Sequence, residues 1–219
     1  MGAILGLLII AEIVDVIDEL LPGFEGTIGE YGDFDCEADC NALHDALHGG
    51  VRIDDEVLIE VLTNRSNVQR QEIQENYEGL YGEKLYDRIN RKCHREKFRD
   101  VLKGLLLTPI QYDARCLRKA MRGIGSSDDD VICEILCARP NAYIEALKEG
   151  YEEKYGDNLM ETVASNTRSE YERFMLALLL AMREEGMDAI DEDAAEADAQ
   201  ELFDVMPYLF AMNYSGNKN

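Results

Sequence analysis

The chain has 219 residues, of which 46% are hydrophobic and 31% are charged, a composition typical of a globular protein and not of a disordered one. Its 22 lysines and arginines are outnumbered by 45 aspartates and glutamates, which gives a formal net charge of −23. This acidity argues against direct binding to nucleic acid, and it means that an anionic membrane repels the chain unless a cation bridges the two.

Residues 1–25 form an apolar and acidic N-terminal extension. The apolar stretch from Met1 to Ala11 is too short to cross a bilayer as a helix. It lacks the basic start of a signal peptide, and acids follow at Glu12 and Asp15. The six cysteines show no dense disulfide pattern, which favours a reducing compartment. We therefore expect a cytoplasmic protein, with secretion left open.

The rest of the chain is an internal duplication. When the sequence is shifted by 74 residues, it matches itself in one register at many positions. The matched pairs include Leu43 with Leu117, Gly49 with Gly123, Asp54 with Asp128, Arg65 with Arg139, Tyr77 with Tyr151 and Gly82 with Gly156. Such self-similarity is the mark of a repeat protein. We place the first copy at residues 26–107 and the second at 108–183.

Each copy is predicted to contain five helices and no strand, so the fold class is all-α. In the first copy we expect helices at 39–48, from 54 onward, at 67–81, at 85–90 and at 95–107. Gly49 and Gly50 would end the first helix, and Asp54 and Asp55 complement the N-terminus of the second. The second copy repeats this order, from a helix at 113–122 to one at 174–182.

Residues 184–219 form an acidic C-terminal tail. Ten acids and no base lie between Glu184 and Asp204, so we expect this part to be a solvated linker.

Three segments of the repeats resemble the annexin repeat. They are residues 62–73, beginning Leu62-Thr63-Asn64-Arg65, residues 121–126 and residues 151–156. The two copies resemble the first and second repeats of an annexin, and residues 197–203 resemble the start of a third, which is incomplete. The resemblance covers roughly residues 26–204 and implies two tandem five-helix annexin-type repeats.

The annexin resemblance implies a calcium site in each repeat. The loop between the first two helices would offer backbone carbonyls, and a carboxylate about forty residues later would complete the oxygen cage that calcium prefers. In the second copy the carbonyl donors are expected at Met121, Gly123 and Gly125, and Asn166 stands where the acid is expected. An asparagine still offers an oxygen but carries no charge, so we expect a weakened site.

The first copy is expected to hold calcium less well than the second. Val51 replaces its second glycine, and Arg52 places a cation beside the loop. The expected acid aligns with Cys93, which is a poor calcium ligand. The alternative for both copies is a glycine turn that ends a helix and binds nothing.

A helix bearing Cys36, Cys40, His44 and His48 at four-residue spacing suggests a second kind of metal site, for zinc. The alternative is a buried thiol at Cys40 with histidines on the surface. Arg65 and Arg139 are expected to form buried ion pairs, because no catalytic motif surrounds them.

The function that these features favour is calcium-dependent binding to acidic phospholipid surfaces, as a peripheral membrane protein and not an enzyme. Calcium would offset the repulsion between the membrane and the acidic chain. The competing hypothesis is a calcium-independent structural or interaction module. Because annexins normally carry four repeats, two repeats would leave apolar faces exposed, and self-association or a protein partner is expected.

Overall fold

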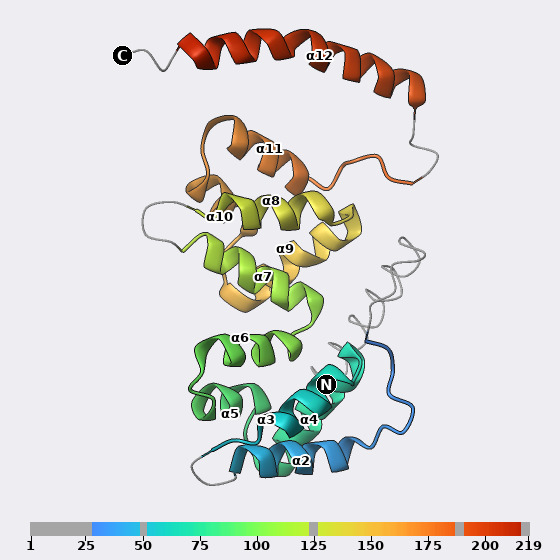
Figure 1. Ribbon diagram of the computed structural model, residues 1–219, viewed down its shortest axis with the longest axis vertical. Helices are drawn as coiled ribbons and strands as arrows, with labels where there is room; N and C mark the ends of the chain where they lie inside the picture. The colour runs from blue at the N-terminus through green and yellow to red at the C-terminus, as the bar shows by residue number, and fades with distance from the viewer. Residues whose placement is uncertain (1–27, 49–51, 123–126, 187–190, 216–219) are drawn as a thin grey trace. The chain divides into compact units, whose positions relative to one another are not determined.

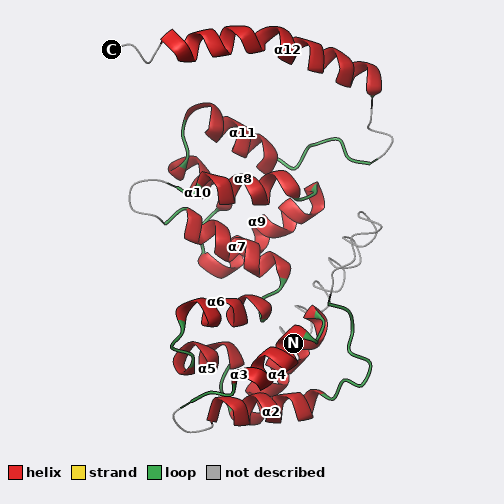
Figure 2. Ribbon diagram, viewed as in Figure 1, coloured by secondary structure: helices red, strands yellow, loops and turns green. Residues whose placement is uncertain are grey.

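A computed structural model describes residues 28–48, 52–122, 127–186 and 191–215. In these residues it contains helices and loops and no strand (Figures 1 and 2), which confirms the all-α fold. The helices of the first repeat are α2 (Cys36–His48), α3 (Asp55–Thr63), α4 (Asn67–Tyr81), α5 (Leu85–Lys92) and α6 (Glu96–Leu105). Those of the second are α7 (Pro109–Ala120), α8 (Asp129–Ala138), α9 (Asn141–Tyr155), α10 (Leu159–Asn166) and α11 (Ser169–Leu179).

Each repeat packs its five helices around its own hydrophobic core. In the first repeat α2 packs on α3 and α4, α3 packs on α6, and α5 packs on α4 and α6. The core of this repeat includes Leu43, Leu58, Ile73, Tyr77 and Ile89, all fully buried. The second repeat repeats the arrangement, with α7 on α8 and α9, α8 on α11, and α10 on α9 and α11. Burial of these apolar side chains is the main force that holds each bundle together.

The helix boundaries follow from local capping chemistry. Asp54 accepts hydrogen bonds from the backbone N–H groups of Glu56 and Val57, so α3 begins where the acids predict. Gly82, at the end of α4, has a φ of 68°, a conformation that glycine adopts without strain. The first helix of the second repeat begins four residues earlier than we expected, because Thr108 and Gln111 form a capping box ahead of it.

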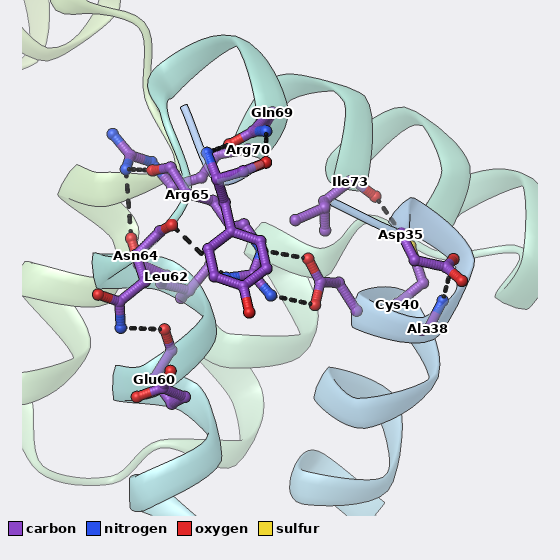
Figure 3. A network of polar contacts seen from close by, with 12 residues as sticks. Asp35, Ala38, Cys40, Glu60, Leu62, Asn64, Arg65, Gln69, Arg70 and Ile73 are labelled. Atoms are coloured by element: carbon purple, nitrogen blue, oxygen red, sulfur yellow. Dashed lines mark hydrogen bonds and ion pairs between the residues drawn. The ribbon is translucent and has the colours of Figure 1, made fainter. Parts of the chain in front are cut away.

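A buried ion pair ties the start of α2 to the end of α3. The Arg65 guanidinium donates to both carboxylate oxygens of Asp39, at 2.6 and 2.8 Å, and it lies over the ring of Tyr31. The Arg70 guanidinium donates to the carbonyls of Leu62 and Arg65 (Figure 3), and also to the carbonyl of Leu105. The expected ion pair of Arg65 is confirmed.

The second repeat pairs Arg139 with Asp113 at 2.8 Å as expected, but only Asp113 is buried, because the Arg139 side chain is partly exposed. Here the Tyr143 hydroxyl also donates to Asp113, at 2.8 Å. Asp113 therefore has two donors, whereas Asp39 relies on Arg65 alone among the side chains bonded to it.

Residues Met182–Asn219 form a separate compact unit. Its one helix in the described residues is α12 (Glu192–Ser215). We expected a solvated linker here, and the side chains described in α12, up to Met206, are exposed. The helix itself was not expected. Alanine and glutamate recur along its first half, and both favour helix.

Candidate functional site

The residues predicted to bind calcium lie at the ends of helices in the second repeat. Met121 caps the C-terminus of α7 and its side chain is buried in the core, so only its backbone carbonyl is left to serve as a ligand. Asn166 is the last residue of α10 and is exposed. Gly123 and Gly125 lie outside the described residues.

The side chain of Asn166 has its oxygen available. Its amide nitrogen donates to the carbonyl of Thr162 at 2.8 Å and to Oγ of Ser165 at 3.2 Å. No described residue donates to its Oδ1. A cation nearby would therefore meet an acceptor that is not already engaged, although Arg168 places a positive charge two residues away.

An acidic cavity of about 760 Å³ opens beside the N-terminus of α8. Ser127, Asp128, Asp129 and Asp130 contribute to its lining. Asp128 is already engaged, because its carboxylate accepts the backbone N–H of Val131 at the start of the helix. Neither Met121 nor Asn166 lines this cavity. The structure thus does not bring Met121 or Asn166 together with these acids.

The first repeat corrects one residue of the sequence alignment. The fourth helix ends at Lys92 in the first repeat and at Asn166 in the second. Lys92, and not Cys93, therefore holds the position of Asn166. Cys93 is fully buried in the core, so it is not available to any ligand at the surface. The sequence alone could have shown this equivalence, because shifting the chain by 74 residues pairs Lys92 directly with Asn166.

Cationic side chains gather at this end of the first repeat. A cavity of about 410 Å³ is lined by Arg52, Ile53, Asp55, Lys92, His94 and Arg95. The only acid among them, Asp55, is ion-paired with Arg95. A calcium ion needs hard oxygen ligands and negative charge. The side chains that line this cavity provide one carboxylate, which is already paired, and several positive charges. The described residues that line this cavity do not fit calcium.

The second repeat fits calcium in part. It offers a backbone carbonyl at Met121 and an amide oxygen at Asn166, both of which calcium accepts as ligands. It lacks a carboxylate at the Asn166 position, so the negative charge that strengthens such sites is missing there.

The zinc alternative on α2 is not supported. Cys40 is fully buried and its thiol donates to the carbonyl of Ile73 at 3.4 Å. The ring of His44 is stacked between His48 and Tyr81, with centroids 3.8 and 3.6 Å apart. No group of three or more His, Cys, Asp or Glu side chains in the described part of the chain is arranged to hold a metal.

None of the helices within the described residues is both long and apolar enough to pass through a bilayer.

Comparisons with known proteins identify the fold. The family model described as Annexin matches residues 38–105 and 112–178. Annexin A5 of Mus musculus is 36% identical over 178 residues, which are 81% of this chain and 54% of annexin A5. Annexin A6 of Rattus norvegicus is 35% identical over 182 residues, which are 83% of this chain and 26% of annexin A6. The chain thus spans about half of one relative and a quarter of the other.

Solved structures agree with these relatives. The structure of annexin III superposes with a TM-score of 0.76 and 32% identity, covering 83% of this chain and 55% of annexin III. A calcium-bound structure of annexin (Sm)1 superposes with a TM-score of 0.68 and 27% identity, covering 82% of this chain and 56% of the other. The family model matches more than half of the residues, in two consecutive copies. The chain therefore belongs to the annexin family.

Proposed function

We propose that this annexin attaches to acidic phospholipid surfaces through calcium, as a peripheral protein of the cytoplasm without enzymatic activity, and that the second repeat carries the calcium site. The observation that supports the second repeat over the first is the residue at the end of the fourth helix. Asn166 offers an oxygen there, whereas Lys92 offers a positive charge.

The proposed ligands are the carbonyls of Met121, Gly123 and Gly125 and the side-chain oxygen of Asn166. Bound calcium would supply positive charge that a lipid phosphate can share. The protein contributes the fixed end of α7, which holds the Met121 carbonyl, and the end of α10, whose intrahelical hydrogen bonds orient the Asn166 side chain. This arrangement would overcome the repulsion between an anionic membrane and a chain of net charge −23.

The test compares one substitution in the two aligned loops. Gly123→Val and Gly49→Val add the same side chain at equivalent positions of the duplication. Co-sedimentation with phosphatidylserine vesicles is measured in calcium and in chelator. We expect calcium-dependent binding by the parent, loss of it in Gly123→Val and retention in Gly49→Val. Equal loss in both variants, or no calcium-dependent binding by the parent, would contradict the proposal.

A second candidate function is an interaction module that needs no calcium. Exposed apolar side chains favour it, since Val101 is 60% exposed and Phe174 and Leu180 are each more than half exposed. Exposed apolar side chains are a feature of association surfaces when they form a continuous patch. Under this hypothesis the chain binds a second copy of itself or a protein partner, and chelator has no effect on that binding.

A further inference from the structure

We propose that the first repeat binds a phosphate group directly, without calcium, in the cavity lined by Arg52, Lys92, His94 and Arg95. The site lies where the family resemblance led us to expect calcium. The exchange of an expected acid for Lys92 makes the same end of the repeat suited to an anion.

The charge of the chain is unevenly distributed around this cavity. Residues 84–103 contain eight of the chain's 22 lysines and arginines but only three acids. The chain as a whole is strongly acidic, so this segment is its most basic part. At physiological ionic strength charges more than about 8 Å away are largely screened. The local cations, and not the net charge of −23, therefore govern the attraction of a small anion to the cavity.

The cations at the cavity differ in how they are held. Arg95 pairs with Asp55 and lies over the ring of Phe98, 4.5 Å from its centroid, so both contacts fix its position. Arg52, Lys92 and His94 form no ion pair with any described residue. Arg52 and His94 are exposed and Lys92 is half-buried. These three side chains are free to turn toward a ligand.

Two helix N-termini meet at the cavity and add to its positive character. Asp55 is the first residue of α3, and Arg95 immediately precedes α6. The N-terminus of α3 is capped by the Asp54 carboxylate, but Arg95 makes no side-chain cap for α6. The first backbone N–H groups of α6 are therefore left for another acceptor. A phosphate oxygen meets this need and the need of the cationic side chains together.

Acids nearby limit the site to one side of Arg52. A neighbouring cavity of about 790 Å³, which also includes Arg52, is lined by Asp45, Asp54, Asp55 and Glu56. The acid that both cavities share, Asp55, is engaged by Arg95. The anion site is therefore confined to the side of Lys92 and His94.

The second repeat provides an internal comparison. The positions equivalent to Arg52 and Lys92 are Ser126 and Asn166, and neither of these is charged. Arg95 is matched by Arg168, since each arginine directly precedes the last helix of its repeat. The cationic cavity is a property of the first repeat, and its ligand differs from that of the second.

The experiment measures binding in chelator, so that calcium plays no part. Vesicles of phosphatidylcholine with phosphatidic acid present a phosphate monoester, and inorganic phosphate presents the same chemistry free of lipid. The variant is Arg52→Gln with Lys92→Gln. The matched control is Lys97→Gln with Lys103→Gln, which removes two positive charges from the same segment at side chains that do not line the cavity.

We expect the parent to bind the vesicles in chelator, and the cavity variant to bind them about tenfold more weakly, as for the loss of one or two charge-assisted hydrogen bonds. The control should change binding less than twofold. Inorganic phosphate is titrated while the backbone amides of residues 92–97 are followed by nuclear magnetic resonance. Chemical-shift changes at these amides that vanish in the cavity variant support a site that accepts any phosphate. If the protein binds the vesicles but not inorganic phosphate, the lipid headgroup is the source of the phosphate.

The proposal is overturned if the parent binds neither probe in chelator, or if the control loses as much affinity as the cavity variant, since the latter result means a diffuse electrostatic attraction. Thermal unfolding of both variants shows whether they remain folded. Calcium-dependent co-sedimentation with phosphatidylserine vesicles is a separate measurement. The phosphate inference can therefore fail while the proposed calcium function stands.

Discussion

Lys92 and Asn166 are the same position of the fold in two copies, each the last residue of the fourth helix in its repeat. One carries a positive charge and the other a neutral amide. This position thus differs in charge between the two repeats, although the helices that lead to it have the same length.

Replacing Asn166 by aspartate should strengthen calcium binding. The carboxylate adds a second ligand oxygen and a negative charge at the end of α10, so we expect an affinity increase of roughly tenfold, equivalent to about 1.4 kcal/mol. Gly125→Val should weaken binding, because a side chain disfavours the turn that the carbonyls need. Isothermal titration with calcium in the presence of anionic vesicles measures both. Asn158→Asp adds the same charge at the opposite end of α10 and should leave the affinity unchanged.

Removing Arg65 should cost the first repeat much of its stability. Arg65→Ala leaves the buried carboxylate of Asp39 without its partner, a loss of about 3–5 kcal/mol. Arg139→Ala is the matched change in the second repeat and should cost less, because Arg139 is partly exposed and Asp113 keeps its hydrogen bond from Tyr143. Urea unfolding gives both free energies. Equal losses would show that the Tyr143 hydroxyl does not compensate.

Ser169 is strained and should be improved by glycine. Its φ of 58° lies in the left-handed region, which costs a residue with a side chain about 1 kcal/mol or more. We therefore expect Ser169→Gly to raise the free energy of unfolding by about 1 kcal/mol. Ser165→Gly, within α10, serves as the contrast and should lower it by roughly 0.5–1 kcal/mol. A destabilised Ser169→Gly would mean that its side chain makes a contact that outweighs the strain.

Stability should fall at alkaline pH, starting near pH 9. Burial raises the pKa of Cys40 from 9.0 to about 12, so the unfolded chain releases this proton before the folded chain does. The folded state therefore loses stability between pH 9 and 12, by about 1.4 kcal/mol per pH unit for each such group. Burial likewise raises the pKa of Tyr77 from 10.0 to about 12.

Two variants separate these contributions to the pH dependence. Cys40→Ala should flatten the fall in stability from pH 9 upward, whereas Tyr77→Phe should flatten it only above pH 10. Denaturant unfolding at a series of pH values provides the slopes. An unchanged slope in Cys40→Ala would show that its thiol does not control the alkaline response.

Self-association should depend on the exposed apolar side chains of the last helix of the second repeat. Phe174 lies on α11 and is 53% exposed. We expect the parent to associate at rising concentration in analytical ultracentrifugation, and Phe174→Glu to shift it toward monomer, because a charge there must be desolvated at an interface. Glu172→Gln, at a partly exposed position of the same helix, is the control. A parent that stays monomeric would remove the support for the interaction module.

The sequence by itself determined the class and the repeat structure of this annexin. Hydrophobic residues at helical spacing, the acids at Asp54 and Asp128 and the glycines at Gly82 and Gly156 act over a few neighbouring residues. Local signals of this kind can be recognised without knowledge of the rest of the fold. Because the duplication repeats each of these signals, the five helices predicted in one copy strengthened the prediction of five helices in the other.

Only the tertiary structure decided which residues share a surface. The cavity of the first repeat joins Arg52 to Lys92 and His94, which lie forty residues away along the chain. The sequence alignment placed Cys93 at this surface, whereas packing buries it in the core and turns Lys92 outward to half exposure. A shift of one residue at the end of a helix changes the direction of a side chain by about 100°, as the 3.6-residue turn requires. Charge at a site therefore depends on where a helix ends, and packing sets that end.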